Sequence, residues 1–227
     1  MQAEAQPVRP VQRLRLTFTK EGVTRYISHL DLARALERSL NRAGLPVAYT
    51  QGFNRRPRLS LAAALPLGYT SEAEVADVWL TAPMATEVFG ARLMARMAPG
   101  ITITDVREVP LGAPSLQQLM AESEYEVRFL DSVNAVALQG ATAEIMAATT
   151  LPGERRRKGN RLQSFDLRPL IREITFTETT DGPRLRLRLV HTATQTGRPD
   201  DVLAALGLDP LDTRVHRIAL RFDDPDL

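Results

Sequence analysis

The chain has 227 residues and a formal net charge of +2 at pH 7, and 44% of its residues are hydrophobic and 25% are charged. These proportions exclude a disordered or fibrous protein, and the length suits two domains of about 110 residues each or one large domain. The absence of cysteine excludes disulfide bonds, thiolate metal sites, iron–sulfur ligation and cysteine nucleophiles.

The first half of the chain alternates strand and helix patterns. Residues 13–20 alternate polar and apolar side chains, which predicts a half-buried strand. A capping box formed by Ser28 and Asp31 precedes a leucine face, which predicts a helix that stops at Gly44. Further strands are predicted at 46–49, 59–65, 74–80 and 101–109, and a second helix at 86–97.

The second half repeats this order after a linker rich in proline and glycine at 110–115. Strands are predicted at 125–130, 171–177, 185–190 and 215–222, helices at 133–148 and 199–205, and a basic loop at 154–161. We therefore expect an α+β fold of two tandem ferredoxin-like (βαββαβ) halves, which span residues 11–110 and 116–227.

Arginine provides nearly all the positive charge, since Lys20 and Lys158 are the only lysines. On the first helix, Arg34, Arg38 and Arg42 are four residues apart and form a stripe opposite the leucine face. The stripe is either a solvated helix face or part of an RNA-binding surface.

The loop 51–58 combines a glycine with aromatic, amide and basic side chains, namely Phe53, Asn54, Arg55, Arg56 and Arg58. An aromatic ring stacks on bases and arginine binds phosphate, so this combination suits single-stranded RNA. The alternative is a tight turn in which Phe53 packs against the core.

The predicted basic loop holds five positive charges within seven residues, namely Arg155, Arg156, Arg157, Lys158 and Arg161. Their mutual repulsion favours an anionic partner. The following Asp166 and Arg168 form either a structural ion pair or, through Arg168, another contact with RNA. Arg184, Arg186 and Arg188 alternate with leucines, so one strand presents arginines on a single face.

His29 is the candidate catalytic residue, because it begins the first predicted helix beside Ser28 and could act as a general base on an RNA 2′-hydroxyl. The alternative is a structural or phosphate-contacting role in the first helical turn. His191 and His216 are far from it in sequence, so we expect no metal site and no cofactor.

No apolar run approaches the roughly 20 residues of a membrane-spanning helix, and the first ten residues lack the apolar stretch of a signal peptide. We therefore expect a cytoplasmic protein with no membrane partner.

Several segments resemble the radical SAM-linked domain family, whose members occur free or fused to radical SAM enzymes. The segments are 26–32, 42–49, 51–54 and 65–68, with further matches at 124–125, 158–159 and 166–169. Where that family continues GFN with Pro-x-Pro, often with histidine between the prolines, this chain has Arg55, Arg56 and Pro57, which weakens an enzymatic interpretation of the loop. The resemblance implies a radical SAM protein as partner, which would supply the cluster cysteines that this chain lacks.

These observations favour a non-catalytic accessory protein that binds RNA, either tRNA or rRNA, and presents it to a radical SAM enzyme. One alternative is a metal-independent endoribonuclease that uses His29. Another is a protein-interaction module that docks the radical SAM partner without nucleic acid.

Overall fold

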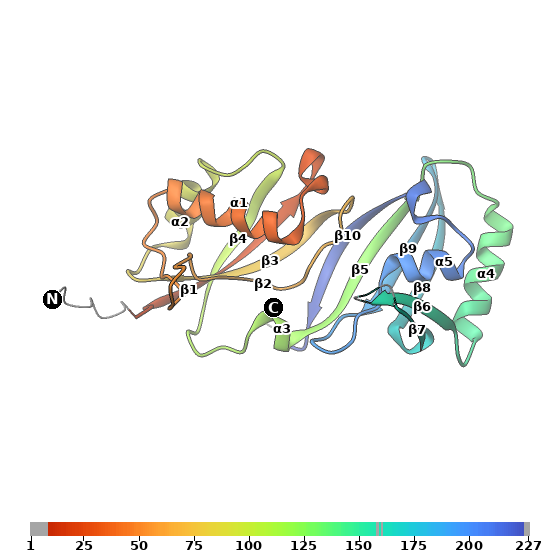
Figure 1. Ribbon diagram of the computed structural model, residues 1–227. Coiled ribbons are helices and arrows are strands. Elements are labelled where there is room, and N and C mark those ends of the chain that lie inside the picture. The colour runs from red at the N-terminus through yellow and green to blue at the C-terminus, as the bar shows by residue number, and fades with distance from the viewer. Residues whose placement is uncertain (1–8, 158, 160, 225–227) are drawn as a thin grey trace. The chain divides into compact units, whose positions relative to one another are not determined.

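The computed structural model describes residues 9–157, 159 and 161–224 (Figure 1). The chain divides into two compact units, Met1–Gln117 (unit 1) and Gln118–Leu227 (unit 2), and each contains antiparallel strand pairs and helices. The division falls just after the predicted linker at 110–115. No helix within the described ranges is long and apolar enough to cross a membrane.

Unit 1 consists of a sheet and its connecting helices. In chain order its elements are β1 (Gln12–Lys20), a 3-10 helix η1 (Gly22–Tyr26), α1 (His29–Arg42), β2 (Leu59–Leu61), β3 (Thr70–Leu80), α2 (Thr86–Met94) and β4 (Ile101–Val109). The short α3 (Leu116–Leu119) contains the boundary between the units, after Gln117. β1 pairs with β3 on one edge and β4 on the other, β2 pairs with β3, and all three pairings are antiparallel.

The core of unit 1 follows the predicted periodicity. Leu14, Leu16 and Phe18 of β1 are buried with Leu32, Leu36 and Leu40 of α1. The α1 helix begins at His29 because the Ser28 hydroxyl accepts a hydrogen bond from the Asp31 backbone N–H at 3.2 Å. Gly44 follows its C-terminal end with φ +60°, a conformation that favours glycine.

The prediction that β1 is half-buried is wrong, since its charged side chains are buried as well. Arg13 and Arg15 are only 2% and 3% exposed, and Asp77 of β3 is fully buried. Arg15 Nε donates to Asp77 Oδ1 at 2.7 Å, and Arg13 Nε donates to Asp77 Oδ2 at 3.1 Å. A carboxylate on the neighbouring strand therefore allows both guanidinium groups to leave water.

Some predicted boundaries in unit 1 also differ from the structure. The predicted strand at 46–49 is reduced to two isolated bridges, Val47 with Leu80 and Tyr49 with Pro57. Prolines at 46 and 57 have no backbone N–H, which works against a continuous ladder there. The predicted strand at 59–65 shortens to β2, the predicted helix at 86–97 ends at Met94, and α3 was not predicted.

Unit 2 repeats the order of strands and helices of unit 1, with the strands β6 and β7 added after its first helix. Its elements are β5 (Met120–Phe129), α4 (Ala135–Ala147), β6 (Pro152–Arg157), β7 (Arg161–Asp166), a 3-10 helix η2 (Arg168–Leu170), β8 (Ile171–Thr179), β9 (Gly182–Val190), α5 (Pro199–Ala205), a 3-10 helix η3 (Pro210–Asp212) and β10 (Thr213–Phe222). The main sheet has the order β10-β5-β9-β8 with antiparallel neighbours.

The prediction of a basic loop at 154–161 is wrong, because most of this segment belongs to an antiparallel hairpin of β6 and β7 outside the main sheet. Its residues have no strict alternation of apolar and polar side chains, so the pattern that identifies a half-buried strand is absent. Backbone pairing along the two arms forms these strands instead.

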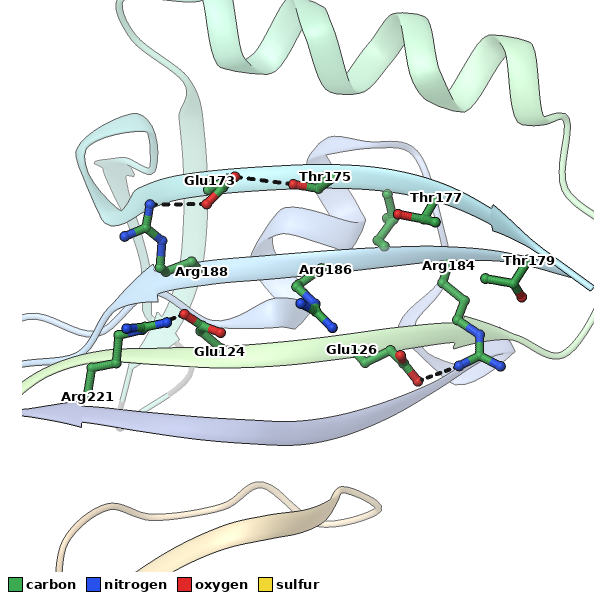
Figure 2. Close-up of a pocket in the computed structure, with 11 residues that line it drawn as sticks. Glu124, Glu126, Glu173, Thr175, Thr177, Thr179, Arg184, Arg186, Arg188 and Arg221 are labelled. Carbon is green, nitrogen blue, oxygen red and sulfur yellow. Dashed lines mark hydrogen bonds and ion pairs between the residues drawn. The ribbon is translucent and has the colours of Figure 1, made fainter. Parts of the chain in front are cut away.

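Alternation along β5 and β9 separates the two faces of the unit 2 sheet. Leu185, Leu187 and Leu189 of β9 are fully buried, as is Val127 of β5. The arginines between these leucines point to the opposite face, where strands β8 to β10 and β5 leave charged side chains accessible (Figure 2). This surface is the open face of unit 2.

Candidate nucleic-acid interface

The open face of unit 2 contains a hollow of about 510 Å³ (Figure 2). Arginines of β9 and β10, glutamates of β5 and β8, and threonines of β8 line it. The arginines at 184, 186 and 188 lie on one face as predicted. Sequence reasoning missed the complementary set on β5, although Glu122, Glu124 and Glu126 show the same period of two.

Most charges on this face are paired. Arg188 contacts Glu122 at 3.4 Å and Glu173 at 3.0 Å. Arg184 contacts Glu126 at 3.1 Å, and Arg221 of β10 pairs with Glu124. The face is therefore an ion-pair network in which acidic and basic groups largely offset one another.

Glu126 remains ionised within this network. Burial by itself would raise the pKa of Glu126, but hydrogen bonds from Arg128 and Arg184 outweigh burial and lower the pKa below its ordinary value. Arg186 lies between these pairs, is exposed, and has no hydrogen bond or ion pair among the described residues. Its guanidinium group is therefore available to an anionic ligand.

The loop at 51–58 in unit 1 is accessible to solvent. Phe53 is fully exposed, and Asn54, Arg55 and Arg56 are exposed as well. The alternative in which Phe53 packs against the core is therefore wrong. Arg58 is also exposed, and its guanidinium carbon lies 4.4 Å from the centre of the Trp79 ring, a cation–π contact that orients it.

The base of this loop is joined to the arginine stripe of α1. Tyr49 donates a hydrogen bond to Asn41 Oδ1 at 2.7 Å, next to Arg42. Arg34 and Arg38 are exposed, with Arg34 paired to Asp31 at 3.1 Å. Unit 1 thus brings the end of the stripe close to the loop, as an extended surface would require.

Arg155, the first arginine of the hairpin, has structural partners. Arg155 Nε donates to Asp201 of α5 at 2.9 Å, and Arg155 Nη2 donates to the Thr196 carbonyl at 2.7 Å. The same guanidinium lies 4.4 Å from the centre of the Phe165 ring, and a Cβ at Gly153 would approach that ring to 2.8 Å. Arg155 therefore holds the hairpin against α5.

The other predicted binding residues of the hairpin are Arg156, Arg157, Lys158 and Arg161. Arg161 is exposed at the start of β7. Lys158 and the side chains of Arg156 and Arg157 lie outside the described residues. The contribution of these three residues to binding stays a prediction.

Arg168 also has structural partners. Its guanidinium donates to the carbonyl groups of Met146 at 3.0 Å, Ala148 at 3.1 Å and Ile171 at 2.9 Å. These bonds satisfy carbonyls at the C-terminal end of α4. The Asp166 carboxylate instead accepts backbone N–H groups from Leu151 and Arg168, so both side chains stabilise the turn after the hairpin.

His29 is the first residue of α1 and is half-buried. The neighbouring Asp31 accepts hydrogen bonds from the Ser28 hydroxyl at 2.7 Å and from Arg34 at 3.1 Å. These contacts commit Asp31 to the helix N-terminus and to an ion pair. These contacts give no support to a role for His29 as a general base.

A family model described as "Uncharacterized protein conserved in bacteria (DUF2344)" matches residues 13–199. No curated protein matches the chain. One similar solved structure is titled "Crystal Structure of a Cbf5-Nop10-Gar1 Complex", with 12% sequence identity and a TM-score of 0.49 over 93% of this chain. The match covers 50% of that structure's chain, so the present chain spans about half its length. Similarity at this level carries no conclusion about function.

Proposed function

The chain belongs to this bacterial family, and we propose that it is a non-catalytic accessory protein that binds RNA and works with a radical SAM enzyme. The proposal includes tRNA and rRNA as the classes of RNA, and RNA modification as the process. It also includes a tandem ferredoxin-like architecture, supported by the β-α-β-β-α-β order of both units once the hairpin is set aside.

The observation that carries the proposal is the fully exposed Phe53 ring among polar and basic neighbours. A phenylalanine side chain that contributes nothing to the core leaves a large apolar surface in water, which favours a partner that covers it. Asn54, Arg55 and Arg56 beside it are exposed donors for bases and phosphates. Stacking on an aromatic ring combined with arginine–phosphate contacts is typical of single-stranded RNA binding.

Replacing Phe53 with alanine is expected to raise the Kd for single-stranded RNA roughly 5- to 150-fold, since base–aromatic stacking contributes about 1–3 kcal/mol. The melting temperature should stay unchanged because the ring lies outside the core. Fluorescence anisotropy with a labelled RNA measures the Kd across a series of KCl concentrations.

Leu211→Ala is the matched control, since Leu211 is another exposed apolar side chain, located in unit 2. The double variant Arg156→Ala/Arg157→Ala should instead flatten the dependence of Kd on salt. Binding through fewer phosphate contacts releases fewer counterions from the RNA. Arg155 is left intact in that variant because it holds the hairpin. Unchanged RNA affinity in both variants would contradict the proposal.

The radical SAM part of the proposal rests on the resemblance of segments such as 26–32 and 51–54 to the radical SAM-linked family. The chain has no cysteine, so the ligands of an iron–sulfur cluster would belong to the partner. A tagged full-length chain isolated from its native cells should retain a radical SAM enzyme, identified by mass spectrometry, and lose it when RNA is digested. A complex that survives nuclease would favour direct docking without RNA, and the absence of any radical SAM enzyme would refute the partnership.

A further inference from the structure

The unit 2 sheet places three arginines side by side across three strands. Arg128 of β5 is directly opposite Arg184 of β9 on one side and Arg214 of β10 on the other. Side chains in such positions have Cβ atoms about 4.5–5.5 Å apart, and like charges there are destabilising. Arg186, two residues from Arg184 on the same face of β9, adds a fourth guanidinium. These four residues are called the arginine cluster below.

Carboxylates of the chain neutralise the arginine cluster only in part. Glu126 Oε1 accepts from Arg128 Nε at 2.8 Å and from Arg184 Nη1 at 3.1 Å. Asp181, whose side chain is 78% exposed, pairs with Arg184 at 3.1 Å. Four guanidinium groups against these two carboxylates leave two positive charges in excess. Glu124, the next glutamate on β5, is paired with Arg221.

Hydroxyl groups of β8 lie next to the cluster. Thr177 is directly opposite Arg184, and Thr175 is directly opposite Arg186. The side chains of these two threonines and of Arg184 and Arg186 line the hollow on the open face (Figure 2). The Thr175 hydroxyl donates to Glu173 at 3.4 Å, which leaves the Thr177 hydroxyl for a ligand. Arg186 has no hydrogen bond or ion pair within the described part of the chain, so its N–H donors remain available as well.

We propose that the arginine cluster, together with the hydroxyl of Thr177, binds a phosphate monoester, namely the terminal phosphate of an RNA strand. This inference deepens the proposed function and rests on it. A phosphate monoester carries about −1.5 to −2 charges at pH 7, which matches the excess of two positive charges. An internal phosphodiester carries about one negative charge per nucleotide and would balance half of that excess. The planar fork of arginine and a neighbouring hydroxyl suit the oxygens of a phosphate group.

The test compares RNA of one sequence with a 5′-phosphate, with a 3′-phosphate and with hydroxyl groups at both ends. The full-length protein is expected to bind one of the phosphorylated forms about tenfold more tightly than the hydroxyl form, the gain typical of charge-assisted hydrogen bonds. Inorganic phosphate and adenosine monophosphate, added as competitors, should reduce that preference selectively. All Kd values are measured by anisotropy at one salt concentration.

Arg186→Gln should abolish the preference without lowering the melting temperature, because Arg186 makes no hydrogen bond or ion pair within the described residues. The matched control is Arg172→Gln, which removes one charge from an exposed arginine and leaves its partner Glu122 bound to Arg188. That control should keep the preference.

Two results would overturn the phosphate subsite while leaving RNA binding intact. One is equal affinity for phosphorylated and hydroxyl RNA, and the other is an Arg186→Gln variant that retains the preference. Binding of adenosine monophosphate or inorganic phosphate without binding of any RNA would instead overturn the assignment to RNA and, with it, the proposed function.

Discussion

Replacing Asp77 with asparagine is expected to destabilise unit 1 by about 3–5 kcal/mol, the loss typical when one partner of a buried ion pair is removed. Asp77 is fully buried, and the guanidinium groups of Arg13 and Arg15 both donate to its carboxylate. Asparagine has nearly the same shape but no charge, so both guanidinium groups would stay buried without a counter-charge.

The substitution should also weaken the attachment of the segment before α3. Arg13 also donates hydrogen bonds to the carbonyls of Ala113 at 2.6 Å and Pro114 at 2.9 Å, so its position ties the predicted linker to the sheet. If Arg13 moves to recover solvent contact, these two bonds are lost together with the ion pair.

Urea unfolding followed by tryptophan fluorescence measures this effect, since Trp79 is the only tryptophan and lies two residues from Asp77 on β3. The guanidinium of Arg13 lies 4.9 Å from the centre of its ring. Asp31→Asn is the matched control in unit 1, because Asp31 is exposed and pairs with the exposed Arg34. A loss for Asp77→Asn no larger than for Asp31→Asn would contradict the structural role of the buried pair.

Lowering the pH from 7.5 to 4.5 is expected to destabilise unit 2 by about 2 kcal/mol through His191 alone. Burial, assisted by the positive charge of Arg217, lowers the pKa of His191 from 6.5 to about 4. Its Nδ1 lies 2.7 Å from the hydroxyl of the buried Ser123. In the unfolded chain the imidazole regains a pKa near 6.5.

The direction of the effect follows from proton uptake. Between pH 6.5 and about 4 the unfolded chain binds a proton at His191 that the folded chain does not bind. The stabilisation is therefore complete above pH 6.5 and is lost as the pH falls toward 4.

Urea unfolding followed by far-ultraviolet circular dichroism at several pH values measures the loss, and His191→Gln should remove this part of the pH dependence. His216→Gln, which alters another half-buried histidine of unit 2, is the control and should retain it. Identical pH profiles for the wild-type protein and His191→Gln would refute a neutral, half-buried His191.

The α+β class and most elements were predictable from residue patterns. The boundaries of β4 and α5 match the predicted ranges at 101–109 and 199–205, and α1 begins directly after its predicted cap. The two helices have strong local signals, namely a capping serine before α1 and a proline at the first position of α5. The hairpin of β6 and β7 lacked such a signal and was predicted as a loop.

The basic and aromatic residues of the candidate site could be predicted from the sequence, but the glutamates of β5 and the arrangement of the side chains could not. The arginines of β9 were recognised from their alternation, and the exposure of Phe53 was one of two open alternatives. The structural partners of Arg155 and Arg168 were not foreseen, because Asp201 and the carbonyls of α4 lie 20 to 46 residues away in sequence. No spacing rule connects residues at such distances.

The sequence by itself determined the fold class, the absence of cysteine chemistry, the order of strands and helices and the surplus of arginine, because each depends on composition or on short-range periodicity. Only the tertiary structure decided which arginines are buried, which are paired and which remain available. Arg13, Arg155 and Arg186 have the same side chain. Strand register and packing nevertheless place Arg13 beside a buried carboxylate, Arg155 against helix α5, and Arg186 on the open face of the unit 2 sheet. The partner of each guanidinium group depends on the segments that lie beside it, and contacts between residues far apart in sequence bring those segments together.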